Sequence, residues 1–298
     1  MKKYILILLI LGITTPAVFA QDEDQKVIPF ESGTMIDAQT TVIMDAKTLE
    51  FAIQHQFGSI ENGHSDLWGI YNPAQDIRLS LNYVPVKNFQ IGAGISKANM
   101  YTDLNAKWTV LQQSTQKMPV SVTLYGNIAI DGRKSSAIAT TEKVVDTKGP
   151  TLPNSIDIDD RFSYFSELMV SRKFCETFSL QAGVSFTHYN MVPWDYDHDI
   201  VGIHVNGKIK FSPQGSFIFT YDNPLKIKDI SEQLDWMSHA RENVAVGVQF
   251  FTFTHAFQIY VGSANGILPQ HAMMFNQNDW TKKGGLAFGF TITRLWMF

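Results

Sequence analysis

The sequence predicts an all-β protein: a transmembrane, antiparallel, up-and-down β-barrel of about 12 strands. Three observations lead to this prediction. Apolar and polar residues alternate with a period of two along most of the chain, which is typical of strands that have one apolar and one polar face. The segments between these strands are alternately short and long. The chain also begins like an exported protein and ends in a strand that stops at an aromatic residue, Phe298.

The N-terminus has the features of a secretory signal peptide. Lys2 and Lys3 form a short basic start, and residues 4–13 are almost wholly apolar. Small residues stand at positions 18 and 20, so we expect a signal peptide over residues 1–20 with cleavage after Ala20. Position 21 is glutamine, which does not support a lipoprotein anchor. The alternative, an uncleaved membrane anchor, is disfavoured because the apolar run is too short to span a bilayer.

The composition narrows the class of protein. Without residues 1–20 the chain keeps 22 basic and 28 acidic residues, a charge of −6, which does not favour nucleic-acid binding. Cys175 is the only cysteine, so an intramolecular disulfide is excluded. Beyond the leader there is no apolar run of about 18 residues. Because 45% of the chain is nevertheless hydrophobic, these residues must fill a β core or cover a barrel.

Twelve strands are predicted, an even number, as in single-chain bacterial barrels. They are expected at 48–57, 75–84, 88–97, 102–112, 118–130, 160–171, 177–188, 200–211, 215–222, 243–250, 255–263 and 285–298. We therefore expect a barrel domain over 48–298, preceded by an N-terminal periplasmic segment over 21–47. Within that segment, residues 33–45 have three possible positions: against the periplasmic mouth, in the lumen as a plug, or in the wall as a further strand.

The links between strands indicate the orientation. Short links are expected at 85–87, 113–117, 172–176, 212–214 and 251–254. Long links are expected at 58–74, 131–159, 189–199, 223–242 and 264–284, and only 98–101 breaks the alternation. Short turns at one end and long loops at the other are typical of outer-membrane barrels, whose turns are periplasmic. A soluble sandwich would show the same alternation along its strands, but it would not sort its loops in this way. We therefore predict an outer-membrane location with both termini in the periplasm.

The last strand resembles the C-terminal signal by which outer-membrane barrels are recognised and inserted. Its signal residues would be Phe290, Ile292, Trp296 and Phe298. The expected partners are therefore outer-membrane lipid and, during biogenesis, the barrel-assembly machinery. Arg294 falls on the lipid-facing side of the same strand, where a charge costs about 2–4 kcal/mol at the bilayer midplane and little near the interface. We expect it near the periplasmic rim.

Several short stretches together resemble a known family. They are Leu49 to Gly58, Asp66 to Ile70, Ile77-Arg78-Leu79, Lys107-Trp108 with Gln112, and Gly289 to Arg294. Together they are similar to a group of exported β-barrel proteins of Gram-negative bacteria that is catalogued only as a domain of unknown function. The family has an arginine where this chain has Gln56. The resemblance covers nearly the whole mature chain and implies an envelope barrel, but it implies no reaction, substrate or functional residue.

Charges on the polar strand faces suggest a pore. The expected pore-lining residues are basic Arg78, Lys107, Arg161, Lys208 and Lys210 and acidic Glu50 and Glu167. This excess of three positive charges would favour anions, because rings of Lys and Arg attract them in a confined lumen. The alternative is a plugged, structural interior in which the two glutamates pair with basic side chains. Twelve strands lie between the filled eight-stranded and the open sixteen-stranded barrel, so their number does not decide.

Other polar groupings carry weaker indications. Asp195, Asp197, His198 and Asp199 share one loop and could bind a cation, but their spacing matches no known metal motif, and an acidic surface loop is the simpler interpretation. His55 and His188 lie on apolar faces near strand ends, where a Ser–His pair could support acyl transfer. No Gly-x-Ser-x-Gly motif is present, and Cys175 lacks a catalytic context. We therefore expect no metal, no cofactor and no enzymatic activity.

The sequence thus supports three functional hypotheses. The first is a narrow channel for small, preferably anionic, solutes. The second is a non-conducting structural or ligand-binding barrel that acts through its extracellular loops, and the third and weakest is an interfacial lipid-modifying enzyme. The sequence identifies no protein or small-molecule partner.

Overall fold

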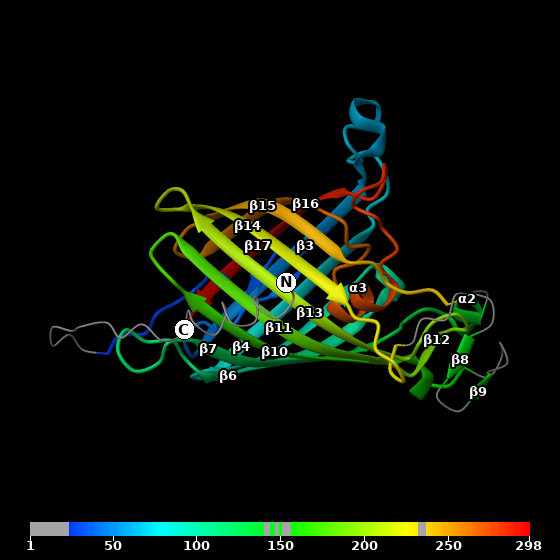
Figure 1. Cartoon of the computed structure of the whole chain (residues 1–298), viewed down its shortest axis with the longest axis horizontal. Coiled ribbons are helices and arrows are strands. Elements are labelled where there is room, and N and C mark those ends of the chain that lie inside the picture. Colours follow the sequence, from blue (N-terminus) through cyan, green and yellow to red (C-terminus); the bar gives the residue numbers. More distant parts are fainter. Residues whose placement is uncertain (1–23, 140–143, 147–148, 151–155, 232–236) are drawn as a thin grey trace.

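The computed structural model describes residues 24–139, 144–146, 149–150, 156–231 and 237–298. The predicted signal peptide lies outside these residues. Within them, twelve long strands form one closed antiparallel barrel (Figure 1), which confirms the predicted fold class. No helix in the described part of the chain is both long and apolar enough to cross a membrane.

The twelve wall strands correspond one to one with the predicted segments, with small shifts at their ends. They are β3 (Thr48–Ser59), β4 (Asp76–Val86), β5 (Phe89–Ser96), β6 (Thr102–Leu111), β7 (Ser121–Ile130), β10 (Phe162–Lys173), β11 (Phe178–Tyr189), β13 (Asp199–Lys210), β14 (Gly215–Pro224), β15 (Asn243–Phe251), β16 (His255–Gly262) and β17 (Ala287–Met297). Each wall strand pairs with the next, and β17 closes the barrel against β3, with Ile292 opposite Ile53.

The alternation of side chains sorts each strand into an inner and an outer face. In β3 the polar Glu50, Gln54 and Gln56 are buried towards the lumen, whereas Leu49 and Phe51 on the other face are only half-buried. Successive side chains of a strand point to opposite sides of the sheet, so this pattern puts the apolar face on the outside of the barrel. The outward apolar surface is the one expected of a wall in contact with lipid.

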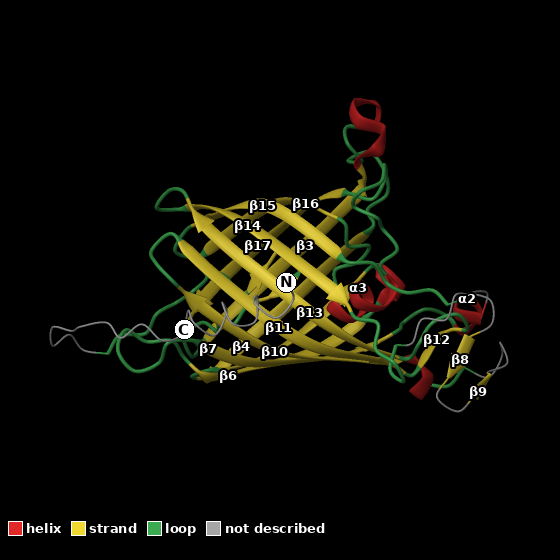
Figure 2. Ribbon diagram, viewed as in Figure 1, coloured by secondary structure: helices red, strands yellow, loops and turns green. Residues whose placement is uncertain are grey.

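The links divide the barrel into two different ends. The links 87–88, 112–120, 174–177, 211–214 and 252–254 share what we call the turn end. The links 60–75, 131–161, 190–198, 225–242 and 263–286, together with the short link 97–101, meet at the opposite, loop end, where the short helices gather (Figure 2). The described part of the chain, which runs with gaps from residue 24 to residue 298, begins and ends at the turn end, since Lys26 bridges to Ser114 and the Phe298 amide donates to the Lys47 carbonyl at 3.2 Å.

Small elements decorate the loop end. They are the 3-10 turns η1 (Ile60–Asp66), η2 (Ala98–Met100) and η3 (Asp159–Arg161), helix α2 (Ser135–Ala139), and a sheet of β8 (Val144–Asp146), β9 (Gly149–Pro150) and β12 (Met191–Pro193). This sheet and α2 lie beyond the barrel wall, whereas helix α3 (Pro269–Phe275) lies at the barrel end (Figure 1).

The apolar core lies inside the barrel, in two clusters. One joins Phe30, Met35, Ile36 and Val42 of the N-terminal segment to inward-facing residues of β14, β15 and β16. The other packs residues of α3 and the link before it against inward-facing aromatic residues such as Tyr125 and Phe165. Both clusters are built by segments that enter the lumen, so the interior of the barrel is filled.

Arg294 lies near a rim of the barrel, as the sequence predicts, and this rim is at the turn end. It points outward from β17 and pairs in register with His255, the first residue of β16, at the turn end. Its guanidinium carbon stands 5.0 Å above the ring of Trp296. The cation therefore sits beside an aromatic residue near the rim, where it can reach water.

Candidate functional site

The N-terminal segment, residues 27–43, passes into the barrel from the turn end and fills the lumen. The Val27 amide donates to the Gln113 carbonyl at 2.9 Å, and residues 29–43 are buried or half-buried. Strands β1 (Thr34–Met35) and β2 (Ala38–Gln39) form a small hairpin that pairs only with itself. Of the three positions that the sequence left open for residues 33–45, the structure shows the lumen.

Two inward-facing glutamines bind the backbone of this segment. Gln258 accepts a hydrogen bond from the Ile36 amide at 2.6 Å and donates one to the Thr34 carbonyl at 2.9 Å. Gln181 accepts from the Thr41 amide and donates to the Gln39 carbonyl, at 2.9 and 2.8 Å. A primary amide offers the same donor and acceptor as a peptide group. These glutamines therefore satisfy buried backbone groups as a neighbouring strand would.

Charged wall residues also contact the segment. Lys107, which is almost fully buried, donates to the Gly33 carbonyl at 2.9 Å. Lys208 forms an ion pair with Glu31 at 2.6 Å, and Gln249 donates to the second oxygen of that carboxylate at 3.2 Å. Two of the three predicted pore-lining lysines, Lys107 and Lys208, are therefore bound to the N-terminal segment.

The other expected pore-lining residues divide between the lumen and its ends. Arg78 lies inside and forms a bidentate pair with Asp103, at 3.1 and 2.7 Å. Any side chain at Gly94 would come within 2.7 Å of both partners, so glycine makes room for this pair. Glu50 and Glu167 are also buried inside. Lys210 is half-buried at the turn end of β13, and Arg161 lies at the loop end.

The lumen is more acidic than the sequence-based count indicates. That count omitted Asp76, Asp103 and Asp222, which are all buried on inward-facing positions. Among the buried inward-facing strand residues, three are basic, Arg78, Lys107 and Lys208, and five are acidic: Glu50, Asp76, Asp103, Glu167 and Asp222. Lys173 and Lys210 lie on the same faces of β10 and β13 and are half-buried at the turn end. The excess of positive charge predicted from the sequence is therefore absent among the buried residues of the lumen.

Helix α3 closes the lumen from the loop end. Gln270 is fully buried and donates to the Asn127 side chain at 2.7 Å, and the Ile267 amide donates to Asp76 at 2.9 Å. Met273 and Met274 are buried in the adjoining apolar cluster. The link 263–286 is therefore partly an inner element, not only an external loop.

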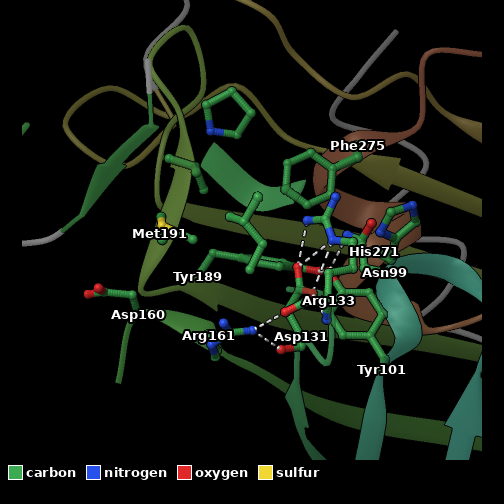
Figure 3. Close-up of a pocket in the computed structure, with 13 residues that line it drawn as sticks. Asn99, Tyr101, Asp131, Arg133, Asp160, Arg161, Tyr189, Met191, His271 and Phe275 are labelled. Atoms are coloured by element: carbon green, nitrogen blue, oxygen red, sulfur yellow. Dashed lines mark hydrogen bonds and ion pairs between the residues drawn. The ribbon is translucent and has the colours of Figure 1, made fainter. Parts of the chain in front are cut away.

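A pocket of about 180 Å³ opens above this closure (Figure 3). One side is aromatic, with Tyr101, Tyr189, His271 and Phe275. The remaining lining residues are mainly polar or aliphatic groups of the loop end: Asn99, Asp131, Arg133, Ile138, Asp160, Arg161, Met191, Val192 and Pro193. The pocket thus combines flat apolar rings with two guanidinium groups, a combination that suits a small polar solute with an apolar body.

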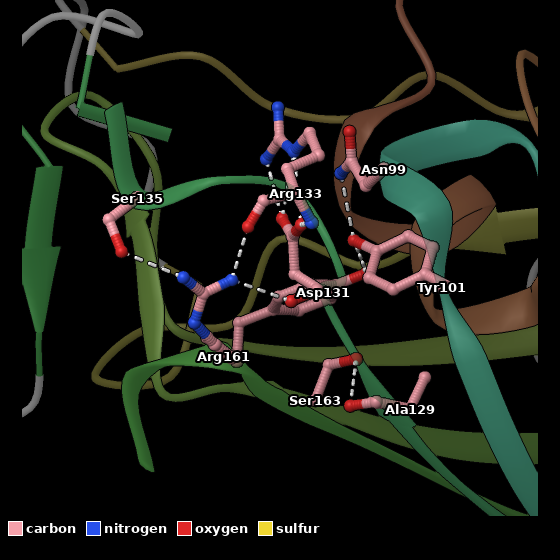
Figure 4. A network of polar contacts seen from close by, with 9 residues as sticks. Asn99, Tyr101, Ala129, Asp131, Arg133, Ser135, Arg161 and Ser163 are labelled. Atoms are coloured by element: carbon pink, nitrogen blue, oxygen red, sulfur yellow. Dashed lines mark hydrogen bonds and ion pairs between the residues drawn. The ribbon is translucent and has the colours of Figure 1, made fainter. Parts of the chain in front are cut away.

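A polar network holds the guanidinium side of the pocket in place (Figure 4). Arg133 pairs with Asp131 at 2.6 Å. Arg161 donates to the carbonyls of Asp131 and Arg133, at 2.9 and 2.5 Å, and to Ser135 Oγ at 2.9 Å. Arg161, predicted to line the pore, is therefore a structural centre of the pocket wall.

His271 faces this pocket from α3. Its ring contacts those of Tyr101 and Phe275, with centroids 5.9 and 5.3 Å apart, and its Nδ1 is buried without a hydrogen-bond partner. Burial, followed by the nearby Arg133, lowers the pKa of His271 to about 4. The imidazole is therefore neutral at pH 7 and offers a hydrogen-bonding nitrogen to a bound molecule.

The acidic loop, His55, His188 and Cys175, which the sequence offered as weaker candidates, do not line this pocket. In the acidic loop, Asp195 accepts from Ser238 at 2.5 Å, and His198 contacts the Tyr189 carbonyl at 2.7 Å. His188 contacts Asp199 at 2.6 Å, whereas the ring of His55 stacks on Phe290 on the outer surface. Cys175 is exposed at the turn end. Within the described residues, no three His, Cys, Asp or Glu side chains are grouped to hold a metal ion.

The fold and its filled lumen define a membrane β-barrel protein. The chain belongs to the family described as a membrane bound beta barrel domain (DUF5777), whose model matches residues 30–296. This confirms the resemblance seen in the sequence. The match includes most of the lumen-filling segment, so that segment is part of the family's domain.

Three solved structures are similar to the chain at low sequence identity, and the first of them shares its fold. The COG4313 outer membrane channel from Pseudomonas putida F1 is 10% identical, with a TM-score of 0.53 over 88% of this chain and 100% of that one. The KdgM porin is 7% identical, with a TM-score of 0.45 over 84% and 99%. The NanC porin is 6% identical, with a TM-score of 0.45 over 83% and 99%. No curated protein matches the chain.

Proposed function

We propose that the protein is an outer-membrane channel for small solutes that its own N-terminal segment closes at rest. The observation that carries this proposal is the burial of residues 29–43 inside a closed twelve-stranded wall. In this proposal the turn end faces the periplasm, as is usual for barrels with short turns at one end. Insertion would depend on outer-membrane lipid and on the barrel-assembly machinery.

The segment is held in a way that allows it to leave. Its hairpin pairs only with itself, and its other contacts are mostly wall side chains bound to its backbone. No ladder between wall strands includes it, so its removal leaves every hydrogen bond of the closed wall intact. The polar wall that it uncovers can be solvated by water. Displacement of the segment would therefore clear the lumen up to α3 without unfolding the barrel, and a movement of α3 would complete the opening.

Solute selection would begin at the loop-end pocket. Its volume, about 180 Å³, is close to that of an engineered cavity of about 150 Å³ that binds benzene in another protein. A solute of one ring would fit between the aromatic side and the guanidinium side. Beyond the pocket, the acidic excess among the buried residues of the lumen favours passage of cations or neutral solutes, in place of the anions expected from the sequence.

Planar bilayers would test this proposal. The full mature chain is expected to show only rare openings, whereas a chain without residues 27–43 is expected to open far more often, because α3 alone then closes the lumen. The reversal potential of these openings is expected to indicate cation preference. Heat-modifiable mobility on gels would verify that the shortened barrel is closed and folded. If the folded, shortened barrel stays silent at all voltages, the channel proposal is wrong.

A closed, ligand-binding barrel is the second candidate. It is favoured by α3, which blocks the loop end independently of the N-terminal segment through Gln270 and Met273. In that case the pocket would bind a solute without passing it on. Ligand-induced stabilisation of a barrel that remains silent after removal of residues 27–43 would identify this function.

A further inference from the structure

We infer that Asp37 is a charge-sensitive latch: the N-terminal segment stays seated while this side chain carries its proton and is released when the proton is lost. The inference rests on the proposed function, because it concerns the control of the same segment. It adds a step controlled by pH, the release of the N-terminal segment, which neither the fold nor the pocket requires.

The position of Asp37 is the first argument. It stands in the turn between β1 and β2 and is 7% exposed, inside the barrel. Its Oδ1 is buried and has no hydrogen-bond partner. It lines a cavity of about 30 Å³, enough for about one water molecule, together with Glu167, His204 and Asp222 of the wall. The segment thus presents a buried acid to a wall that already carries two acids.

The wall groups are engaged with one another. His204 contacts Asp222 through Nδ1 and Ser185 through Nε2, both at 2.7 Å. Asn243 donates to the second oxygen of Asp222 at 2.9 Å. The imidazole is thus hydrogen-bonded to Asp222 and Ser185 and not to Asp37. Its attraction for an ionised Asp37 offsets the burial of that carboxyl and the repulsion from Asp222 only in part.

The remaining elements around the turn bring no further cation to Asp37. Tyr260 faces it from β16 and brings a hydroxyl group, not a cation. From the α3 side the cavity is lined by Ile267, Pro269, Ala272 and Met273, none of which titrates. Lys107 acts on Glu167 and Glu50, and its amino group is bonded to the Gly33 carbonyl. An ionised Asp37 would therefore meet like charge in a space without room for several waters.

The direction of the pH effect follows from linkage. Burial, followed by repulsion from Asp222, raises the pKa of Asp37 to about 8. In water the same group ionises near its ordinary value of about 4. Between these two pH values, the seated state binds one proton more than the released state. The free-energy difference that favours the seated state therefore falls as the pH rises. The seated-to-released ratio is expected to drop about tenfold per pH unit between about 4 and 8, and to level off above about 8.

A spin label at the exposed start of the segment would measure release directly. Ile28 is 49% exposed, so Ile28→Cys in a Cys175→Ser background can be labelled without disturbing the lumen. The mobile fraction of the label, recorded from pH 5 to 9 in lipid, is expected to rise with pH in this background. In the Asp37→Asn variant it is expected to stay low and constant. The same pH dependence in both chains would overturn the latch.

A matched control uses the other acid of the segment. Glu31→Gln removes the ion pair with Lys208 and is expected to raise the mobile fraction at every pH while keeping the slope. Asp222→Asn provides a second test at the latch, because it removes the like charge and should bring the levelling-off to a lower pH. An unchanged profile in Asp222→Asn would also count against the latch.

The outcomes separate the latch from the channel. If the label responds to pH through Asp37 but no variant conducts, the latch stands and the proposed channel fails. If removal of residues 27–43 opens a current while Asp37→Asn keeps the full pH dependence of the label, the channel stands and the latch fails.

Discussion

At the scale of single residues, the interior is held by buried charges that have specific partners. Arg78 and Asp103 illustrate this, because both are buried and bound to each other through two hydrogen bonds. The loss of one member of a buried pair leaves an uncompensated charge, which is more costly than the pair is stabilising. Paired residues of the lumen should therefore be sensitive to single substitutions.

Asp103→Ala is expected to lower the free energy of unfolding of the barrel by about 3–5 kcal/mol, since it strands the Arg78 guanidinium. The measurement is the urea midpoint of the folded, heat-modifiable form. A double variant, Arg78→Met with Asp103→Leu, should recover much of the loss. Equal stability of Asp103→Ala and the unmodified chain would refute the assigned pairing.

Because of His271, we expect the stability of the native state to rise with pH, whereas the seating of the segment by Asp37 is expected to weaken with pH. The neutral form of His271 is the buried one, and its pKa is lowered to about 4. The unfolded chain binds its proton near pH 6.5, so the native state loses stability as the pH falls from about 6.5 to about 4. Relative to His271→Gln, the chain should lose about 2 kcal/mol between pH 7 and 4.5, read from urea midpoints. A constant difference between the two chains would contradict this account.

At the scale of elements, the N-terminal segment depends on side chains that imitate a neighbouring strand. Gln258 uses both ends of its amide on Thr34 and Ile36. An apolar residue of similar size would leave two backbone groups unpaired in a dry interior, and each such loss costs about 1–3 kcal/mol. The seating of the segment should therefore weaken far more than the barrel itself.

Gln258→Leu is expected to increase the frequency of openings in planar bilayers by at least tenfold, with the conductance of each opening unchanged. Gln277→Leu is a suitable control, because this glutamine contacts Tyr196 and the His239 carbonyl among the loops, outside the lumen. Similar opening frequencies in both variants would show that the amide of Gln258 does not hold the segment.

The wall strands could be predicted from the sequence because their periodicity is a property of each strand alone. Glu50 and Leu49 fall on opposite faces in any antiparallel barrel. The lumen-filling segment could not be predicted, because its hairpin is very short and its partners, such as Gln181, come from distant strands. Helix α3 gives little signal for the same reason: a seven-residue helix is stabilised by its packing and not by its own propensity.

The candidate site was predictable only in part. The buried lysines and glutamates of the polar faces were identified, but their roles depend on partners that the alternation does not reveal. Lys208 is paired with Glu31 across the lumen, and Arg161 supports loop carbonyls. The pocket residues Tyr101 and His271 come from different loops, and only the closed barrel brings them together. Long-range assembly, not local pattern, creates this site.

At the scale of the whole molecule, the protein is a rigid wall around a separable interior. The wall is continuous through β17 and β3, so it has no free edge. The interior consists of two inserted segments, one from each end, which meet around the small cavity beside Asp37. Opening therefore requires movement of the inserts alone, and the wall supplies the fixed frame against which they move.

The central claim is that the N-terminal segment occupies the lumen. Deuterium exchange of the peptide spanning residues 30–43, measured near pH 6 in lipid, tests it most directly. The amides of Ile36 and Thr41 donate to buried glutamines, so the peptide should be protected to nearly the same degree as the neighbouring strand β3. Exchange at the rate of an unstructured peptide, beside a protected β3, would contradict the account.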